Sequence, residues 1–118
     1  MRVFRGYSRP VPAPVVLAIG NFDGVHLGHA ALVKRLAQVA EARQLAPMVL
    51  TFEPHPREFF APDSAPARLT TLREKLELLG ECGARQAMIC PFNAAFAALS
   101  ADAFVEQVLV RGCQVRHL

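Results

Sequence analysis

The sequence predicts a doubly wound α/β domain, with a parallel sheet and helices on both faces. Three short runs with little polar interruption, residues 15–19, 48–52 and 86–90, are typical of strands buried on both faces. Amphipathic segments separate these runs, which is the order expected of right-handed βαβ crossovers. A hydrophobic content of 53% with 19% charged residues provides a core and excludes an intrinsically disordered chain.

The N-terminal third supplies a connector, a strand and a helix. Residues 9–14 contain three prolines, which lack backbone donors and cannot lie inside a sheet ladder. We interpret them as a connector between a short N-terminal edge segment and the strand at 15–19, which Gly20 ends. From residue 29 to about 44, apolar residues recur at three- and four-residue steps and predict an amphipathic helix. Its apolar positions are Leu32, Val33, Leu36, Val39 and Ala40.

The rest of the chain continues the alternation. Residues 71–74 have the capping-box form S/T-x-x-E and predict a helix to about Cys82, with Gly83 ending it in a left-handed conformation. After the strand at 86–90, either Asn93 or Ser100 can cap the next helix, 101–111, which Gly112 stops. Residues 115–118 begin a further strand. Because such a domain rarely ends on an unfinished strand, we expect residues 1–118 to be the N-terminal part of one domain.

Composition narrows the class of protein. The net charge of +3 is scattered and too weak to indicate nucleic-acid binding. No apolar run approaches the length of a membrane span, and the N-terminus lacks the apolar region of a secretory signal. Three cysteines, Cys82, Cys90 and Cys113, have neither zinc nor disulfide spacing, so we expect core residues in a reducing compartment. A cytoplasmic protein follows.

The chemistry is expected in the loop GNFDGVHLGH at residues 20–29, which leaves the first buried strand. Ligands of such sheets bind at the carboxyl ends of the strands. The loop has neither the dinucleotide fingerprint nor a Walker A lysine. Its glycines let the backbone approach a ligand closely, and the N-terminus of the next helix has unpaired amide groups. His26 and His29 can donate hydrogen bonds to phosphate oxygens. These parts form a cradle for a triphosphate. A metal held by the two histidines is the less favoured alternative, since no third ligand has helical spacing.

The loop resembles the HxGH signature of the nucleotidyltransferase superfamily. Two further blocks, TFEPHP at 51–56 and RLTTLREK at 68–75, extend the resemblance to the FMN adenylyltransferase (FAD synthetase) module of bacterial bifunctional riboflavin kinase/FAD synthetases. The resemblance covers nearly the whole chain. It implies transfer of AMP from ATP, with Mg²⁺, to the phosphate of FMN, which gives FAD and pyrophosphate. It also implies a riboflavin kinase domain in cis beyond these residues.

The resemblance assigns roles within the loop. His26 and His29 would stabilise charge as pyrophosphate leaves, and no metal ligand is assigned to the chain. Asn21 and Asp23 would either contact the ligand or fix the loop, and an Asx turn is the alternative for Asp23. The residues expected at ATP are Gly20, Asn21, Phe22, Asp23, Gly24 and Gly28.

The second block is expected at the flavin. Its members are Pro54, His55 and Pro56, followed by Arg57 for the flavin phosphate and Phe60 for stacking on the ring. For Arg57 a solvated side chain is the alternative, and for Phe60 a core position is. Later parts of the family pattern, including an arginine for the triphosphate, lie beyond residue 118. We therefore expect these residues alone to show little or no adenylyl transfer.

Two other functions stay open at this point. One is another HxGH nucleotidyltransferase, acting on phosphopantetheine, nicotinate mononucleotide or glycerol phosphate, which would not need the TFEPHP block. The other is a non-catalytic module that binds flavin or nucleotide and regulates a partner. Binding to nucleic acid or to membranes is not expected.

Overall fold

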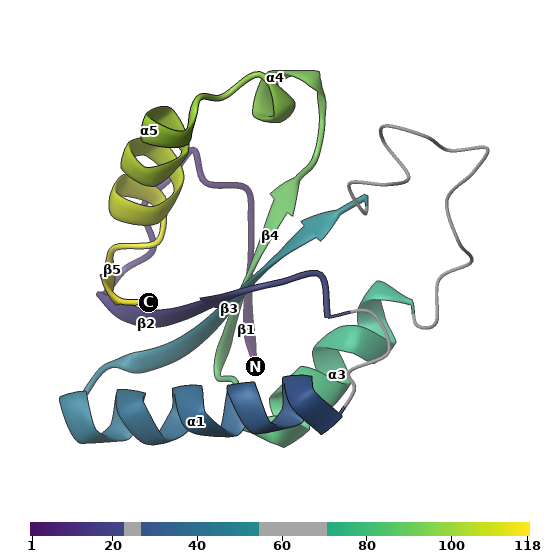
Figure 1. Ribbon diagram of the computed structural model, residues 1–118, viewed down its shortest axis with the longest axis vertical. Helices are drawn as coiled ribbons and strands as arrows, with labels where there is room; N and C mark the ends of the chain where they lie inside the picture. Colours follow the sequence, from purple (N-terminus) through teal and green to yellow (C-terminus); the bar gives the residue numbers. More distant parts are fainter. Residues whose placement is uncertain (23–26, 55–70) are drawn as a thin grey trace.

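The computed structural model describes residues 1–22, 27–54 and 71–118, and its core is an all-parallel sheet (Figure 1). Within these residues the sheet has five strands in the order β1-β4-β3-β2-β5. The strands are β1 Arg2–Arg5, β2 Val15–Ile19, β3 Ala46–Glu53, β4 Gln86–Pro91 and β5 Val115–His117. The expected N-terminal edge segment is β1, which pairs with β4, and the expected last strand is β5, which pairs with β2.

Helices cover both faces of the sheet, as predicted for a doubly wound fold. On one face lie α1 (Leu27–Arg43) and α3 (Leu72–Cys82), and on the other α5 (Ala101–Ala103) runs into the π-helix η1 (Phe104–Gly112) (Figure 1). The short α4 (Ala94–Ala97) follows β4. The winding reverses at β2, so its carboxyl end lies at the switch point where such folds bind ligands. None of the helices in these described parts is long and apolar enough to cross a membrane.

Two apolar layers explain why the strand sequences lack alternation. Side chains that face α1 and α3 include Val16, Ala18 and Val49, and those that face η1 include Leu17, Met48, Leu50 and Met88. Successive residues of a strand point to opposite faces, so a sheet covered on both sides needs apolar residues at nearly every position. In α1 the buried stripe is narrower than predicted: Val33, Leu36 and Ala40 are buried, but Leu32 is 46% exposed.

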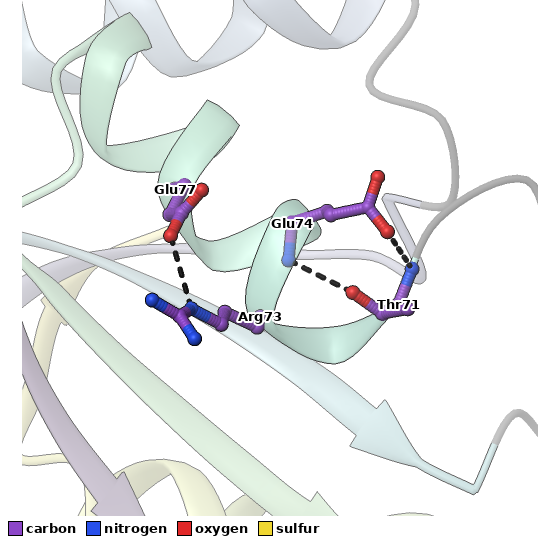
Figure 2. Close-up of polar contacts among 4 residues, drawn as sticks. All are labelled: Thr71, Arg73, Glu74 and Glu77. Carbon is purple, nitrogen blue, oxygen red and sulfur yellow. Dashed lines mark hydrogen bonds and ion pairs between the residues drawn. The ribbon is translucent and has the colours of Figure 1, made fainter.

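The helix signals of the sequence are largely confirmed. Figure 2 shows the capping box of α3: the Glu74 amide donates to Thr71 Oγ1 at 3.1 Å, and the Thr71 amide donates to Glu74 Oε1 at 3.3 Å. An exposed pair between Arg73 and Glu77, one turn apart at 3.2 Å, lies beside it. Gly83 ends the helix with φ +121°. The cap fixes where α3 begins and therefore which of its residues face the sheet.

The predicted cap Ser100 is confirmed for the helix that starts at Ala101, but two details of the C-terminal helices differ from the prediction. Asn93 and Ser100 are both caps, because a short helix forms after each of them. The prediction that the helix stops before Gly112 is wrong: η1 includes Gly112, and Gln114 adopts the left-handed φ of 51° instead. The Gln114 side chain donates to the carbonyl of Val11.

Two of the three cysteines are core residues, as predicted. Cys90 and Cys113 are fully buried, whereas Cys82 is partly exposed. Burial, with a contribution from Cys113, raises the pKa of Cys90 to about 12, and burial raises the pKa of Cys113 to about 11. Unfolded thiols titrate near pH 8.5, so the fold favours the protonated forms. The two thiols therefore leave the stability of the folded state unchanged below about pH 8.5. As the pH rises from there toward the folded pKa values, the folded state loses stability relative to the unfolded chain.

Native alkylation should therefore separate the three thiols. Because the thiolate is the nucleophile, iodoacetamide at pH 8 is expected to modify Cys82 and to leave Cys90 and Cys113 unmodified. Peptide mass spectrometry measures the modification at each site, and the same reaction in urea should reach all three. Equal native rates at the three cysteines would contradict the burial described here.

Candidate functional site

The predicted site residues gather at the carboxyl ends of β2 and β3. Gly20, Asn21 and Phe22 follow β2, and Gly28 and His29 lie in the first turn of α1. Pro54 follows β3 directly and is exposed. The remaining predicted residues lie outside the described part of the chain, and their roles stay predictions: Asp23, Gly24, His26, His55, Pro56, Arg57 and Phe60.

The start of the loop folds back on itself. The Gly20 amide donates to the Leu50 carbonyl at 3.0 Å, which extends the pairing of β2 with β3 by one residue. Phe22 has φ +54°, is 2% exposed, and turns its ring over Gly20. A Cβ at position 20 would lie 3.0 Å from that ring, so a larger residue there would require the ring to move by a few tenths of an ångström. The ring of Phe22 is part of the core. Gly20 and Phe22 could therefore contact a nucleotide, as predicted, only through their backbone atoms.

A hydrogen-bonded group holds the carbonyl of Asn21. Lys75 Nζ, from α3, donates to this oxygen at 2.9 Å and to Thr51 Oγ1, on β3, at 2.9 Å. Thr51 Oγ1 itself lies 3.1 Å from the same carbonyl oxygen and donates to it. Three segments far apart in the sequence thus meet at the carbonyl of Asn21. The Asn21 side-chain Oδ1 is buried without a hydrogen-bond partner within the structure described.

The first turn of α1 presents the imidazole of His29 beside Gly28, which has no side chain. The ring of His29 stands edge-on to the ring of Phe22, with centroids 5.4 Å apart and an interplanar angle of 76°. His29 is partly buried and Gly28 is exposed. Among the residues that the structure describes, none outside the neighbouring chain positions lies within 4 Å of a Cβ added at Gly28. A phosphate group could therefore approach the helix N-terminus next to this imidazole.

A small apolar hollow lies near the end of β3. It measures about 270 Å³, and four of its lining residues are phenylalanines. Their rings pack on one another: the centroid of the Phe96 ring lies 5.6 Å from that of Phe52 and 5.2 Å from that of Phe92. Phe52 comes from β3, just before Glu53 and Pro54, while the other rings come from the segment 92–104. The lining residues are Phe52, Phe92, Phe96, Ala97, Leu99, Ser100, Ala101 and Phe104. Flat apolar walls of this kind suit an aromatic ring.

A larger hollow lies elsewhere and is not assigned to the site. It measures about 1700 Å³ and opens between α1, α3 and β1, where Arg2, Pro47 and Arg85 mark the amino ends of the strands. Ligands of doubly wound sheets bind at the opposite, carboxyl ends. We therefore assign the functional site to the carboxyl ends of β2 and β3, with the smaller aromatic hollow beside β3.

Two residues of this site, Thr51 and Lys75, were not predicted as site residues, although both lie within the TFEPHP and RLTTLREK motifs. A signal for each was present. Lys75 precedes Leu79 by four residues, so it lies on the buried stripe of α3, where a lysine is unusual. Thr51 interrupts an otherwise apolar strand. A charged and a hydroxyl residue at core positions predict a hydrogen bond between buried groups.

The chain is similar to known proteins over almost its whole length. The family model described as FAD synthetase matches residues 8–118. The bifunctional riboflavin kinase/FMN adenylyltransferase of Escherichia coli K12 is 48% identical over 121 residues, which cover 100% of this chain and 39% of that protein. The protein of the same description from Pseudomonas fluorescens is 43% identical over 120 residues, 100% of this chain and 38% of that protein. The chain thus spans about two fifths of the length of these relatives.

A solved structure supports the fold alone. The crystal structure of a macrolide-efflux protein from Streptococcus pneumoniae superposes with a TM-score of 0.79 at 21% identity. The match covers 98% of this chain and 39% of that one. It confirms the α/β architecture predicted from the sequence.

Proposed function

Because the chain belongs to the FAD synthetase family, whose model matches residues 8–118, we propose that it carries the ATP- and FMN-binding core of an FMN adenylyltransferase. The family match is the observation that carries this proposal. The geometry supports it, since the first turn of α1, with Gly28 and His29, and an apolar hollow lie at the carboxyl ends of the strands. A relative with another nucleotidyl acceptor, or a non-catalytic module, has no comparable support.

The reaction needs alignment more than acid–base chemistry. A phosphate oxygen of FMN attacks the α-phosphorus of ATP, and the bond from that phosphorus to the bridging oxygen breaks as pyrophosphate leaves. The attacking oxygen is already anionic, so no strong base is required. The protein must hold the two groups in line and stabilise the charge on the departing pyrophosphate. His29, with the predicted His26, supplies hydrogen-bond donors for that charge.

The residues after β2 and at the start of α1 are proposed to bind ATP. Gly28 leaves room for the phosphates at the helix N-terminus, and the backbone of Gly20, Asn21 and Phe22 shapes the floor of the site. The buried Asn21 Oδ1 offers an acceptor to a ligand N–H. Asp23 and Gly24 complete the proposed set.

The aromatic hollow is proposed to take the isoalloxazine ring of FMN. Phe52 links it to the TFEPHP block, because it lies immediately before Glu53 and Pro54 at the end of β3. The predicted flavin residues Pro54, His55, Pro56, Arg57 and Phe60 continue from that point. The hollow contributes apolar walls, and Arg57 would meet the flavin phosphate.

Mg²⁺ is proposed to enter with ATP. The described residues contain no group of three His, Cys, Asp or Glu placed to hold a metal ion. We propose a Mg²⁺ that is bound mainly through the ATP phosphates and water, with at most one or two protein oxygens, as Mg²⁺ commonly is in ATP sites. When bound, the ion would neutralise charge on the triphosphate.

A chimeric enzyme tests the proposal. Residues 1–118 replace the 121 matching residues of the Escherichia coli relative, and FAD formation from FMN, ATP and Mg²⁺ is measured by chromatography. We expect turnover comparable with that of the parent enzyme. The chain alone, which spans 39% of that relative's length, should show little or none.

Two outcomes would overturn the proposal or its second part. A folded chimera that binds neither ATP nor FMN, beside an active parent, would show that residues 1–118 are not an adenylyltransferase core. FAD formation by the chain alone at the rate of the chimera would show that these residues already hold a complete site.

A further inference from the structure

Lys75 is a charged side chain in a place where charge is unfavourable. It is 2% exposed, and Thr51 is the one other buried polar residue among those the structure describes. Removing an ammonium from water is strongly unfavourable unless hydrogen bonds replace the lost hydration. A methionine or leucine would fill the same space at lower cost. The lysine therefore supplies something that packing alone does not require.

Its hydrogen bonds act on the residue that starts the predicted phosphate loop. Lys75 Nζ and Thr51 Oγ1 both donate to the carbonyl of Asn21, at 2.9 and 3.1 Å. This carbonyl belongs to the peptide that joins Asn21 to Phe22. Its direction therefore limits the backbone angles of Phe22, which adopts the left-handed φ of 54°. Two donors on one oxygen fix that peptide plane.

The effect continues through Phe22 to the candidate catalytic imidazole. The Phe22 ring is buried between Gly20 and His29, with its centroid 5.4 Å from that of His29. A rotation of the Asn21–Phe22 peptide would move this ring and remove one wall against which His29 is oriented. The path therefore runs from α3 through the start of the loop to the first turn of α1.

We propose that Lys75 is a positioning residue, which holds residues 20–22 so that Phe22 orients His29 toward the ATP phosphates. The inference rests on the proposed function for its effect on turnover, but not for its effect on structure. Lys75 acts through Asn21 and Phe22 and does not itself need to touch the nucleotide. Thr51 completes the same device by bridging the lysine and the carbonyl.

Lys75→Met is the variant that tests this role, with Lys34→Met as its matched control. Lys34 lies exposed on α1 and is the other lysine of the chain. Methionine keeps the length and apolar volume of the buried side chain. The carbonyl of Asn21 keeps Thr51 as a donor, so the fold should persist while the start of the loop loses its second restraint.

The first measurement concerns the 118-residue chain and is independent of any activity. Heteronuclear NMR spectra should show that Lys75→Met shifts or broadens the resonances of Asn21, Phe22 and the His29 ring, with β4 and η1 unchanged. Lys34→Met should leave all of them in place. If Lys75→Met leaves the three residues at their wild-type shifts, the positioning role is refuted.

The second measurement uses the chimera described above. Lys75→Met should lower kcat by about 10- to 100-fold, as expected for a misplaced catalytic group, and leave the KM for FMN nearly unchanged. Thr51→Val should act in the same direction, and Thr51→Ser, which keeps the hydroxyl, should restore turnover. A purely structural lysine would lower stability but not kcat per folded molecule. If the unsubstituted chimera makes no FAD, the proposed function fails, while the NMR result still decides the positioning role.

Discussion

Replacing His29 by alanine in the chimera is expected to lower FAD formation by about 100- to 1,000-fold, the loss typical of removing one donor to charge that develops in a transition state. The imidazole lies in the first turn of α1 beside Gly28, where the leaving pyrophosphate is proposed to bind. Steady-state chromatographic assays at saturating ATP and FMN measure the effect. His26→Ala should act in the same direction.

Two companion variants separate hydrogen bonding from packing. His29→Phe keeps an aromatic ring against Phe22 but has no donor, so it should lose as much activity as His29→Ala. His117→Ala, at an exposed position on β5, is the matched control and should retain full turnover. Full activity in both His26→Ala and His29→Ala would remove the role assigned to the pair.

The fold was predictable because the sequence of each buried strand shows on how many faces its sheet is covered. In β2, Val15 and Leu17 face η1 while Val16 and Ala18 face α1, so the uninterrupted apolar run already indicated a sheet covered on both faces. The four residues of β1 carry no such signal. Their partner is set by long-range hydrogen bonds, such as that from the Gly6 amide to the Ile89 carbonyl at 2.9 Å, which local patterns do not encode.

The sequence was sufficient to predict where the site lies, but not which hydrogen bonds hold its backbone in position. The loop motif located the end of β2 and the imidazoles, because spacing and residue type are visible in one segment. The hydrogen-bonded group under it joins Asn21 to Lys75 across 54 positions and Lys75 to Thr51 across 24. Such a group exists only once α3 packs on the sheet. The left-handed Phe22 was equally hidden, since a phenylalanine is an unfavourable residue for that conformation and only tertiary packing requires it there.

The same reasoning applies to Gly112, which the sequence marked as a helix stop and the structure shows as a close contact. A Cβ at this position would lie 2.9 Å from the Cβ of Tyr7 and 3.3 Å from the carbonyl oxygens of Tyr7 and Gln107. The Gly112 carbonyl also accepts the Val11 amide at 2.8 Å. The glycine thus lets the N-terminal connector pack directly on η1.

Gly112→Ala should therefore lower the free energy of unfolding by about 2–3 kcal/mol, because the clash meets backbone and Cβ atoms that cannot move aside as a flexible side chain would. Urea denaturation of the chain measures the change. Gly80→Ala is the matched control: its Cβ would meet only the end of the Met1 side chain, at 3.5 Å, within α3. There alanine should add about 0.5–1 kcal/mol through its better helix propensity. If the two variants were equally stable, the packing of Tyr7 against η1 would not be what selects glycine at position 112.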